Sequence, residues 1–403
     1  MTAISQSFPR WFGKRKPNRS PYKLGWGKAS LLALPMVFLT ALMTFGQIMQ
    51  PGSTPDPLVL LATALTWLLF NSIFFAMVKT GQTDRYRAFL FVSMAVAFIV
   101  FFMAEIIEKR GSLALTGANM IEGETPFCHL VIPMIILPAA VTRTVIFPGS
   151  LMEGFASVAG MIVLWTGASL VLGRAWCSWG CFYGGIDEGF SRLLKKPRIT
   201  KIDRRWTLLP WAVLLGVVLV SAVTLSPAYC EWLCPFKAVT EFEAITSIKV
   251  VIQTIIFVSL FISTVVVLPI LTKRRTQCGL FCPMGALQGA TNKINIYDVR
   301  IDPAKCTQCG HCEKNCPTFS IDESSYTSGT PLMSCTKCGK CVDVCPNHAI
   351  SYHIKGTQPG ARPLIARMLF LYPAFLFLAT FGGGMFISAI WRILRLLTTG
   401  SMI

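Results

Sequence analysis

Long apolar runs constrain the fold of this chain more than any other feature. They cover residues 28–50, 57–78, 88–104, 151–172, 207–225, 250–271 and 368–390. Each run is close to the roughly 20 helical residues that cross a hydrocarbon core of about 30 Å. Because only 14% of the 403 residues are charged, we predict an all-α polytopic membrane protein with six or seven transmembrane helices.

Basic residues give the chain a formal net charge of +18, but their positions argue against a nucleic-acid partner. They gather beside the apolar runs, in residues 10–23 and again in residues 192–205. This is the pattern of cytoplasmic loops in membrane proteins. No small-residue cleavage site closely follows the first run, so we expect a retained anchor. We expect a multi-pass protein of a bacterial or archaeal cytoplasmic membrane, with its amino terminus inside.

Two cysteine-rich stretches, "CTQCGHCEKNCP" from Cys306 and "CTKCGKCVDVCP" from Cys335, share the spacing C-x2-C-x2-C-x3-C-P. In bacterial two-cluster ferredoxins the first three cysteines ligate one cluster, and the fourth, before a proline, ligates the other. The spacing therefore predicts one 4Fe-4S cluster on Cys306, Cys309, Cys312 and Cys345, and a second on Cys335, Cys338, Cys341 and Cys316. Zinc is disfavoured because it needs four ligands rather than a duplicated eight. We expect a small α+β ferredoxin module here.

Three further cysteine pairs form a weak internal repeat: "WCSWGCFYGGIDE", "YCEWLCPFKAVTE" and "QCGLFCPMGALQ". Each pair follows an apolar run and precedes a plausible helix. Successive pairs are separated by one membrane crossing, so we expect them to alternate between the two faces. Cys177, Cys181, Cys278 and Cys282 then lie inside and supply four thiolates for a third 4Fe-4S cluster.

The second pair, Cys230 and Cys234, is expected outside, where Cys128 is the remaining cysteine. With His129 as a fourth ligand these residues could hold a fourth cluster, since histidine replaces cysteine in some iron–sulfur centres. A disulfide or plain buried thiols remain open alternatives. The segment from Cys128 to Pro148 contains Arg143 and several prolines, which disfavour a membrane-spanning helix. We expect it to be re-entrant or to lie at the outer face.

At Gly173–Pro346 the sequence resembles the membrane polyferredoxins typified by the NapH and NosR components of periplasmic nitrate and nitrous-oxide reduction. The resemblance implies C-x3-C-P motifs at the ends of membrane helices, a cytoplasmic double-cluster ferredoxin, and electron transfer between the quinone pool and partner redox proteins. This sequence departs from the family pattern by having three pairs instead of two and Phe182 where proline is usual. It also lacks the large periplasmic flavin-binding domain of the NosR type.

Other cofactors find little support in the sequence. The four histidines are His129, His311, His348 and His353, and the last three lie in or beside the ferredoxin module. A bis-histidine haem between membrane helices is therefore nearly excluded, and the absence of C-x-x-C-H excludes covalent c-type haem. The stretch Thr166–Ser169, "TGAS", faintly resembles the surroundings of a covalent flavin, but small residues more often serve helix packing.

Carboxylates beside the apolar runs, including Asp187 and Glu188, have two interpretations. They could relay protons during quinol oxidation, or they could simply solvate helix ends.

The predicted organisation has four parts: a basic cytoplasmic segment (1–27), a transmembrane electron-transfer domain with three C-x3-C loops (28–275), a cytoplasmic ferredoxin module (276–362) and a carboxyl-terminal transmembrane helix (363–403). We expect an electron-transfer subunit of an oxidoreductase complex that connects cytoplasmic-side clusters with the quinone pool or a redox partner. An accessory factor that supplies electrons to mature or reactivate another metalloenzyme is the alternative. Clusters on opposite faces would be too far apart for one efficient electron hop, so something must bridge them.

Overall fold

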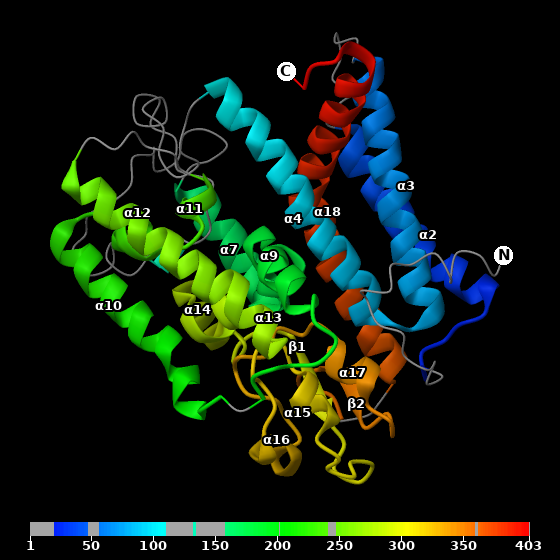
Figure 1. The fold of residues 1–403 in the computed structure, drawn as a ribbon. Coiled ribbons are helices and arrows are strands. Elements are labelled where there is room, and N and C mark those ends of the chain that lie inside the picture. Colours follow the sequence, from blue (N-terminus) through cyan, green and yellow to red (C-terminus); the bar gives the residue numbers. More distant parts are fainter. Residues whose placement is uncertain are drawn as a thin grey trace.

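The computed structural model describes residues 20–46, 56–109, 132–133, 158–200, 202–240, 247–358 and 362–402. The chain is mostly helical, with a small ferredoxin-like region at one end of a bundle of long helices (Figure 1). Among the described residues, five helices are long and apolar enough to cross a membrane, at Trp26–Gly46, Pro57–Thr80, Arg204–Thr224, Ile248–Thr272 and Pro363–Thr399. The chain is therefore a multi-pass membrane protein, and these five helices coincide with five of the predicted apolar runs.

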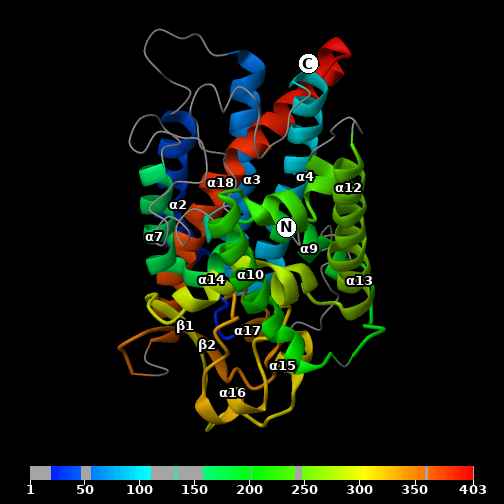
Figure 2. The ribbon, with the colours of Figure 1, turned by 90° about the vertical axis from the view of Figure 1, so that its left-hand side faces the viewer.

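The long helices are α2 (Trp26–Gly46), α3 (Pro57–Thr80), α4 (Thr83–Lys109), α7 (Val158–Leu172), α10 (Leu209–Thr224, after the 3-10 turn η4, Arg204–Leu208), the continuous α12–η6–α13 (Ile248–Leu260, Phe261–Val267, Leu268–Thr272) and α18 (Pro363–Thr399). Between them lie the short elements η3 (Gly173–Ala175), α8 (Trp176–Trp179), α9 (Phe182–Ser191), η5 (Tyr229–Leu233), α11 (Lys237–Thr240), η7 (Gln277–Phe281) and α14 (Pro283–Thr291). Figure 2 shows the long helices standing side by side above the ferredoxin-like region. The predicted re-entrant segment, Cys128–Pro148, lies outside the described residues except for Ile132 and Pro133.

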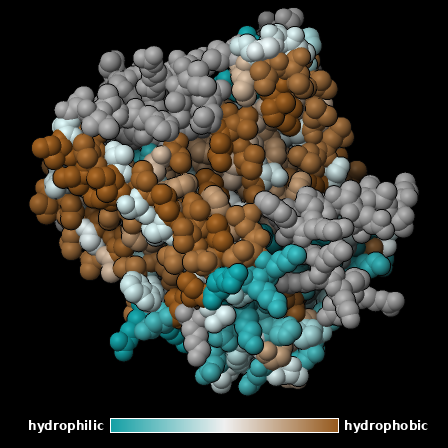
Figure 3. Space-filling model, in the orientation of Figure 1, coloured by the Kyte–Doolittle hydropathy of each residue, from teal (hydrophilic) through white to brown (hydrophobic). Residues whose placement is uncertain are grey.

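The outer surface of the helices is apolar. Val223 on α10 is 84% exposed and Ile248 on α12 is 80% exposed. Figure 3 shows brown, hydrophobic side chains over the helical part, while hydrophilic side chains gather around the ferredoxin-like end. So large an exposed apolar surface is stable only against lipid, since soluble proteins rarely expose contiguous patches of more than a few hundred Å².

Helix α18 packs against α3 and α4 and forms the centre of the aromatic core. The ring of Phe375 lies 4.7 Å from that of Phe74, and the ring of Phe386 lies 5.1 Å from that of Phe70. The buried Arg367 guanidinium donates to the Met77 carbonyl oxygen at 3.0 Å, which ties the start of α18 to the end of α3. These contacts fix the position of α18 against α3.

The turn between α3 and α4 is shorter than the sequence suggested. Arg85 and Arg87 lie between the predicted apolar runs 57–78 and 88–104, yet they belong to the first two turns of α4. The helix can begin at Thr83 because the Asp343 carboxylate accepts hydrogen bonds from the backbone N–H groups of Thr83 (3.2 Å) and Asp84 (2.7 Å). A carboxylate in this position satisfies free helix N–H groups and complements the helix dipole.

The ferredoxin-like region contains one two-stranded antiparallel sheet and three short helices. Strand β1 (Tyr297–Ile301) pairs with β2 (Ile350–Ile354) so that Tyr297 faces Ile354. The helices are α15 (His311–Asn315), α16 (Glu323–Ser328) and α17 (Lys340–Val344). The ring of Tyr352 on β2 stacks on Phe370 of α18 at 4.7 Å, which fixes the module against the membrane helices.

Candidate iron-sulfur sites

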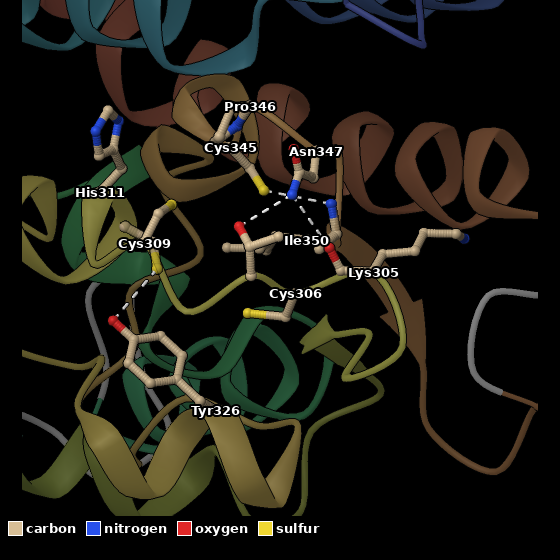
Figure 4. Close-up of a pocket in the computed structure, with 12 residues that line it drawn as sticks. Lys305, Cys306, Cys309, His311, Tyr326, Cys345, Pro346, Asn347 and Ile350 are labelled. Carbon is tan, nitrogen blue, oxygen red and sulfur yellow. Dashed lines mark hydrogen bonds between the residues drawn. The ribbon is translucent and has the colours of Figure 1, made fainter.

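The first ferredoxin site is a pocket lined by Cys306, Cys309, Cys312 and Cys345 (Figure 4). Ala349 donates its backbone N–H to the Cys345 sulfur at 3.3 Å, and the Tyr326 hydroxyl lies 3.8 Å from the Cys312 sulfur. Cys309 is the one exposed cysteine among those the structure describes. The predicted first set of ligands therefore comes together in one pocket.

The second ferredoxin site gathers Cys335, Cys338, Cys341 and Cys316. Burial raises the pKa of the Cys341 thiol well above its ordinary value, and the nearby thiols of Cys335, Cys338 and Cys316 raise it further. Burial likewise raises the pKa of Cys335 to about 12 and that of Cys338 to about 11. The metal-free thiols of Cys335, Cys338 and Cys341 are therefore protonated at neutral pH, and binding iron would release protons.

The two ferredoxin loops repeat the same local backbone. Gly310 and Gly339, which follow the second cysteine of each loop, have left-handed φ values of 70° and 83°. At Gly339 a side chain would also be excluded sterically, because a Cβ atom there would lie 2.6 Å from the Tyr352 hydroxyl. The fourth cysteines, Cys316 and Cys345, are extended with φ of −65° and −66°, as expected of a residue before proline.

The inner site gathers Cys177, Cys181, Cys278 and Cys282. Cys177 lies in α8 and Cys278 in η7, while Cys181 and Cys282 are the extended residues that start α9 and α14. Burial raises the pKa of Cys181 well above its ordinary value, and the neighbouring thiols of Cys177 and Cys282 raise it further. The structure therefore brings together the four cysteines that were expected on one membrane face.

Buried arginines hold the inner site. The Arg275 guanidinium donates to the Cys177 carbonyl oxygen at 2.6 Å and to the Cys278 sulfur at 3.1 Å. Arg174 donates to the Cys278 carbonyl oxygen at 2.9 Å. Both arginines are buried, at 0% and 3% exposure. Their positive charges would stabilise thiolates in a site that excludes water.

The donor chemistry of the three sites fits iron–sulfur clusters. Backbone N–H groups point at cysteine sulfurs in each site, from Ala349 to Cys345, from Ser320 to Cys316 (3.2 Å) and from Gly184 to Cys181 (3.4 Å). Within the described part of the chain, no three Cys, His, Asp or Glu side chains converge on a single metal ion. Four spread thiols with N–H donors suit a larger anionic group such as a 4Fe-4S cubane.

The remaining pair, Cys230 and Cys234, has the same local form as the third pair. Cys230 lies in the π-helical turn η5, as Cys278 lies in η7, and Cys234 is extended with φ of −77°. Both cysteines are buried. Their proposed companions, Cys128 and His129, lie outside the described residues.

The segment around this pair reaches back toward the inner site. Gln277, next to Cys278, donates to the Tyr229 hydroxyl at 3.3 Å. Phe236 stacks on Tyr183 with ring centroids 4.0 Å apart. The alternation of the pairs between the two membrane faces predicts this pair on the outer face. In the structure its segment contacts residues beside the inner site.

Sequence reasoning missed the charged residues between the sites. Arg87 and Arg275 lie beside predicted apolar runs, where basic residues are expected to mark cytoplasmic loops. Both side chains are nevertheless 0% exposed. They pair with Glu188, whose carboxylate lies 3.1 Å from Arg87 and 3.8 Å from Arg275. Glu188 and Asp187 are therefore buried partners of cations and of the Cys278 N–H rather than solvated helix ends.

Comparison with known proteins agrees with this geometry. A family of 4Fe-4S dicluster domains matches residues 298–346, and a family of 4Fe-4S binding domains matches three times, at residues 153–200, 207–249 and 254–296. Each of the three repeats contains one cysteine pair. No solved structure matches the chain.

Curated relatives show the same combination. The chain is 26% identical to the putative electron transport protein YccM of Escherichia coli, over 42% of this chain and 48% of that protein. It is 32% identical to the methylamine utilization ferredoxin-type protein MauN of Methylorubrum extorquens, over 41% of this chain and 57% of that protein. The regulatory protein NosR of Pseudomonas aeruginosa is 28% identical, over 44% of this chain and 25% of that protein.

The chain is therefore similar to membrane polyferredoxins of the NapH/NosR type, and it combines 4Fe-4S binding domains with membrane helices. The chain spans about half the length of the first two curated relatives, with 48% and 57% of those proteins covered.

The inner site has no room for a side chain at Gly184. A Cβ atom there would press on the Arg275 guanidinium and lie 2.6 Å from the Cys177 carbonyl oxygen. We expect Gly184→Ala to displace both groups and remove the inner cluster, with loss of about four irons per chain. Iron analysis of the purified variant measures this loss.

Gly189→Ala, on the same helix α9, is the matched control, because its Cβ atom would meet Val92 at an ordinary 3.5 Å. Both substitutions gain the same helix propensity. Full iron content in Gly184→Ala would contradict the arrangement of the inner site.

Proposed function

We propose that this chain holds 4Fe-4S clusters at the first ferredoxin site, the second ferredoxin site and the inner site, and carries electrons one at a time between the cytoplasmic side and a quinone or redox partner. The observation that carries this proposal is that twelve cysteines form three groups of four, with N–H donors on the sulfurs. Each cluster, when bound, would take up and release one electron at a potential in the range of about −700 to +450 mV.

The residues around each site differ in ways that suit a route through the protein. The first site carries the exposed Cys309, where a soluble partner can approach, whereas Cys338 and Cys341 of the second site are buried. The loop of the second site contacts that of the inner site, since the Trp179 indole N–H donates to the Lys337 carbonyl oxygen at 3.5 Å. The three sites thus lie in series, from the aqueous end toward the membrane helices.

The Cys230–Cys234 pair is the next candidate position for a cluster after the inner site. The contacts of Gln277 with Tyr229 and of Tyr183 with Phe236 bring its segment beside the inner site. A fourth cluster on Cys230, Cys234, Cys128 and His129 would extend this proposal. Such a cluster would shorten the gap that electrons must cross to the other membrane face.

The proposed organisation follows the four parts 1–27, 28–275, 276–362 and 363–403, with the ferredoxin module in the cytoplasm. Basic residues support this orientation, because Lys273 donates to the Leu194 carbonyl oxygen at 2.6 Å and so joins two basic loops at the ferredoxin end. The positive-inside rule assigns that end to the cytoplasm.

Iron and acid-labile sulfide analysis of the purified full chain tests the number of clusters. Three clusters predict about 12 irons and 12 sulfides per chain, since each cubane holds four of each. A content near eight would remove the inner cluster from the proposal. A content near 16 that falls by four in Cys230→Ser/Cys234→Ser would add the fourth cluster.

The orientation is tested with topology reporters on either side of α18, which runs from the ferredoxin end to the opposite end of the bundle (Figure 1). A phosphatase inserted at the exposed turn of Gly356 is expected to be inactive and a fluorescent protein there bright. The same reporters fused after Gly400 are expected to give the reverse. Identical behaviour at the two positions would contradict the proposed crossing.

Quinol exchange distinguishes an electron-transfer subunit from an accessory factor. If the chain reacts with the quinone pool, a soluble quinol analogue should reduce the oxidised clusters of the purified protein, or the corresponding quinone should oxidise clusters that were first reduced with dithionite and freed of excess reductant. Electron paramagnetic resonance follows either reaction. Inertness toward quinones, together with co-purification of a large metalloenzyme, would favour the accessory role instead.

A further inference from the structure

One buried side chain touches the loops of two cysteine sites at once. Arg87, near the start of α4, donates through Nε to the carbonyl oxygen of Cys338 at 3.1 Å. It donates through Nη1 to the carbonyl oxygen of Ser178 at 2.9 Å. Cys338 belongs to the second ferredoxin site, and Ser178 follows Cys177 of the inner site.

Carboxylates complete the surroundings of this guanidinium. Its Nη2 atom lies 3.0 Å from Asp84 and 3.1 Å from Glu188. The same two carboxylates also accept from Arg192, at 2.8 Å from Asp84 and 2.5 Å from Glu188. The two guanidinium groups and the two carboxylates therefore compensate one another.

A contribution to stability does not by itself explain the buried ion pairs of Arg87 with Asp84 and Glu188. Taking a guanidinium and two carboxylates out of water costs several kcal/mol per ion, and apolar residues of the same size often replace buried ion pairs without loss. A planar guanidinium, however, offers donors in fixed directions that an apolar side chain lacks. Arg87 uses those directions to reach two carbonyl oxygens on separate segments of the chain.

We propose that Arg87 is the positioning residue that couples the second ferredoxin site to the inner site, by fixing the separation of their cysteine loops and supplying the hydrogen-bonded path between them. This inference rests on the proposed function. A single electron passes from one set of thiolate-bound iron to the other, in either direction, with no bond broken and no proton moved. The guanidinium stays protonated throughout, since its charge is held by Asp84 and Glu188.

The test compares electron exchange between the two sites in the full chain. Arg87→Met/Glu188→Gln removes the bridge and one carboxylate together, so that no net charge is left uncompensated. We expect full iron content, but electron equilibration slower by about tenfold or more, the order of penalty that follows loss of a positioning contact. Rapid freezing after flash photoreduction, read by electron paramagnetic resonance, gives the rate and the potential of each site.

Two variants serve as matched controls. Arg192→Met/Glu188→Gln removes the other cation together with the same carboxylate, so it matches the charge change of the test variant and is expected to leave the exchange rate unchanged. Glu188→Gln alone keeps Arg87 and isolates the effect of the carboxylate. An exchange rate equal to wild type in Arg87→Met/Glu188→Gln, with full iron content, would overturn the proposal.

Arg87→Lys decides the matter if the double variant loses iron. Lysine keeps the charge but presents a single point donor that cannot reproduce the fork. Full iron with slowed exchange supports the coupling role, whereas wild-type exchange, or loss of iron in this variant too, assigns Arg87 a structural role only. Failure of the proposed function is seen separately, because wild-type protein would then lack the signal of the inner site.

Discussion

The cysteine-bearing segments depend on buried guanidinium groups that hold them together. Arg275 joins the first and third pairs by donating to the Cys177 carbonyl oxygen and the Cys278 sulfur. Burial alone would raise the pKa of Glu188, but Arg87, Arg192 and Arg275 hold that pKa well below its usual range. The carboxylate is therefore ionised and anchors the cations. Removing one partner from such a group commonly costs about 3–5 kcal/mol, because an uncompensated charge stays buried.

Local spacing explains why the ferredoxin sites were predictable. The C-x2-C-x2-C-x3-C-P stretches determine which cysteines share a loop, and the proline forces the fourth cysteine into an extended conformation. The inner site was predictable for another reason. Two membrane crossings separate the first and third pairs, so Cys177, Cys181, Cys278 and Cys282 are expected on one face. The burial of Arg87 and Arg275 was not predictable, because a charged residue beside an apolar run looks the same in the sequence whether it faces water or a buried carboxylate. Only the fold places Glu188 within reach of both.

The three cysteine pairs are one structural unit in spite of their different sequences. In each, a helical turn carries the first cysteine, and an extended second cysteine precedes or starts the next helix. Phe182, where the family pattern has proline, does not alter this form, since Cys181 has φ of −82° and ψ of 105°, close to the values of Cys282. Its sulfur accepts the Gly184 N–H at 3.4 Å and so takes the place of a helix cap. The missing proline therefore leaves the geometry of the first pair intact.

The position of the Cys230–Cys234 pair bears on how electrons could cross the membrane. Two opposite-face clusters would leave too wide a gap for one efficient hop. In the structure, however, the segment of this pair contacts residues next to the cysteines of the inner site. Tyr229 accepts a hydrogen bond from Gln277, and Phe236 stacks on Tyr183. Tyr229 and Gln277 occupy equivalent positions before the first cysteine of their units, so the hydrogen bond joins two copies of one repeat. Repetition of a single cysteine unit thus places two of its copies in contact inside the bundle.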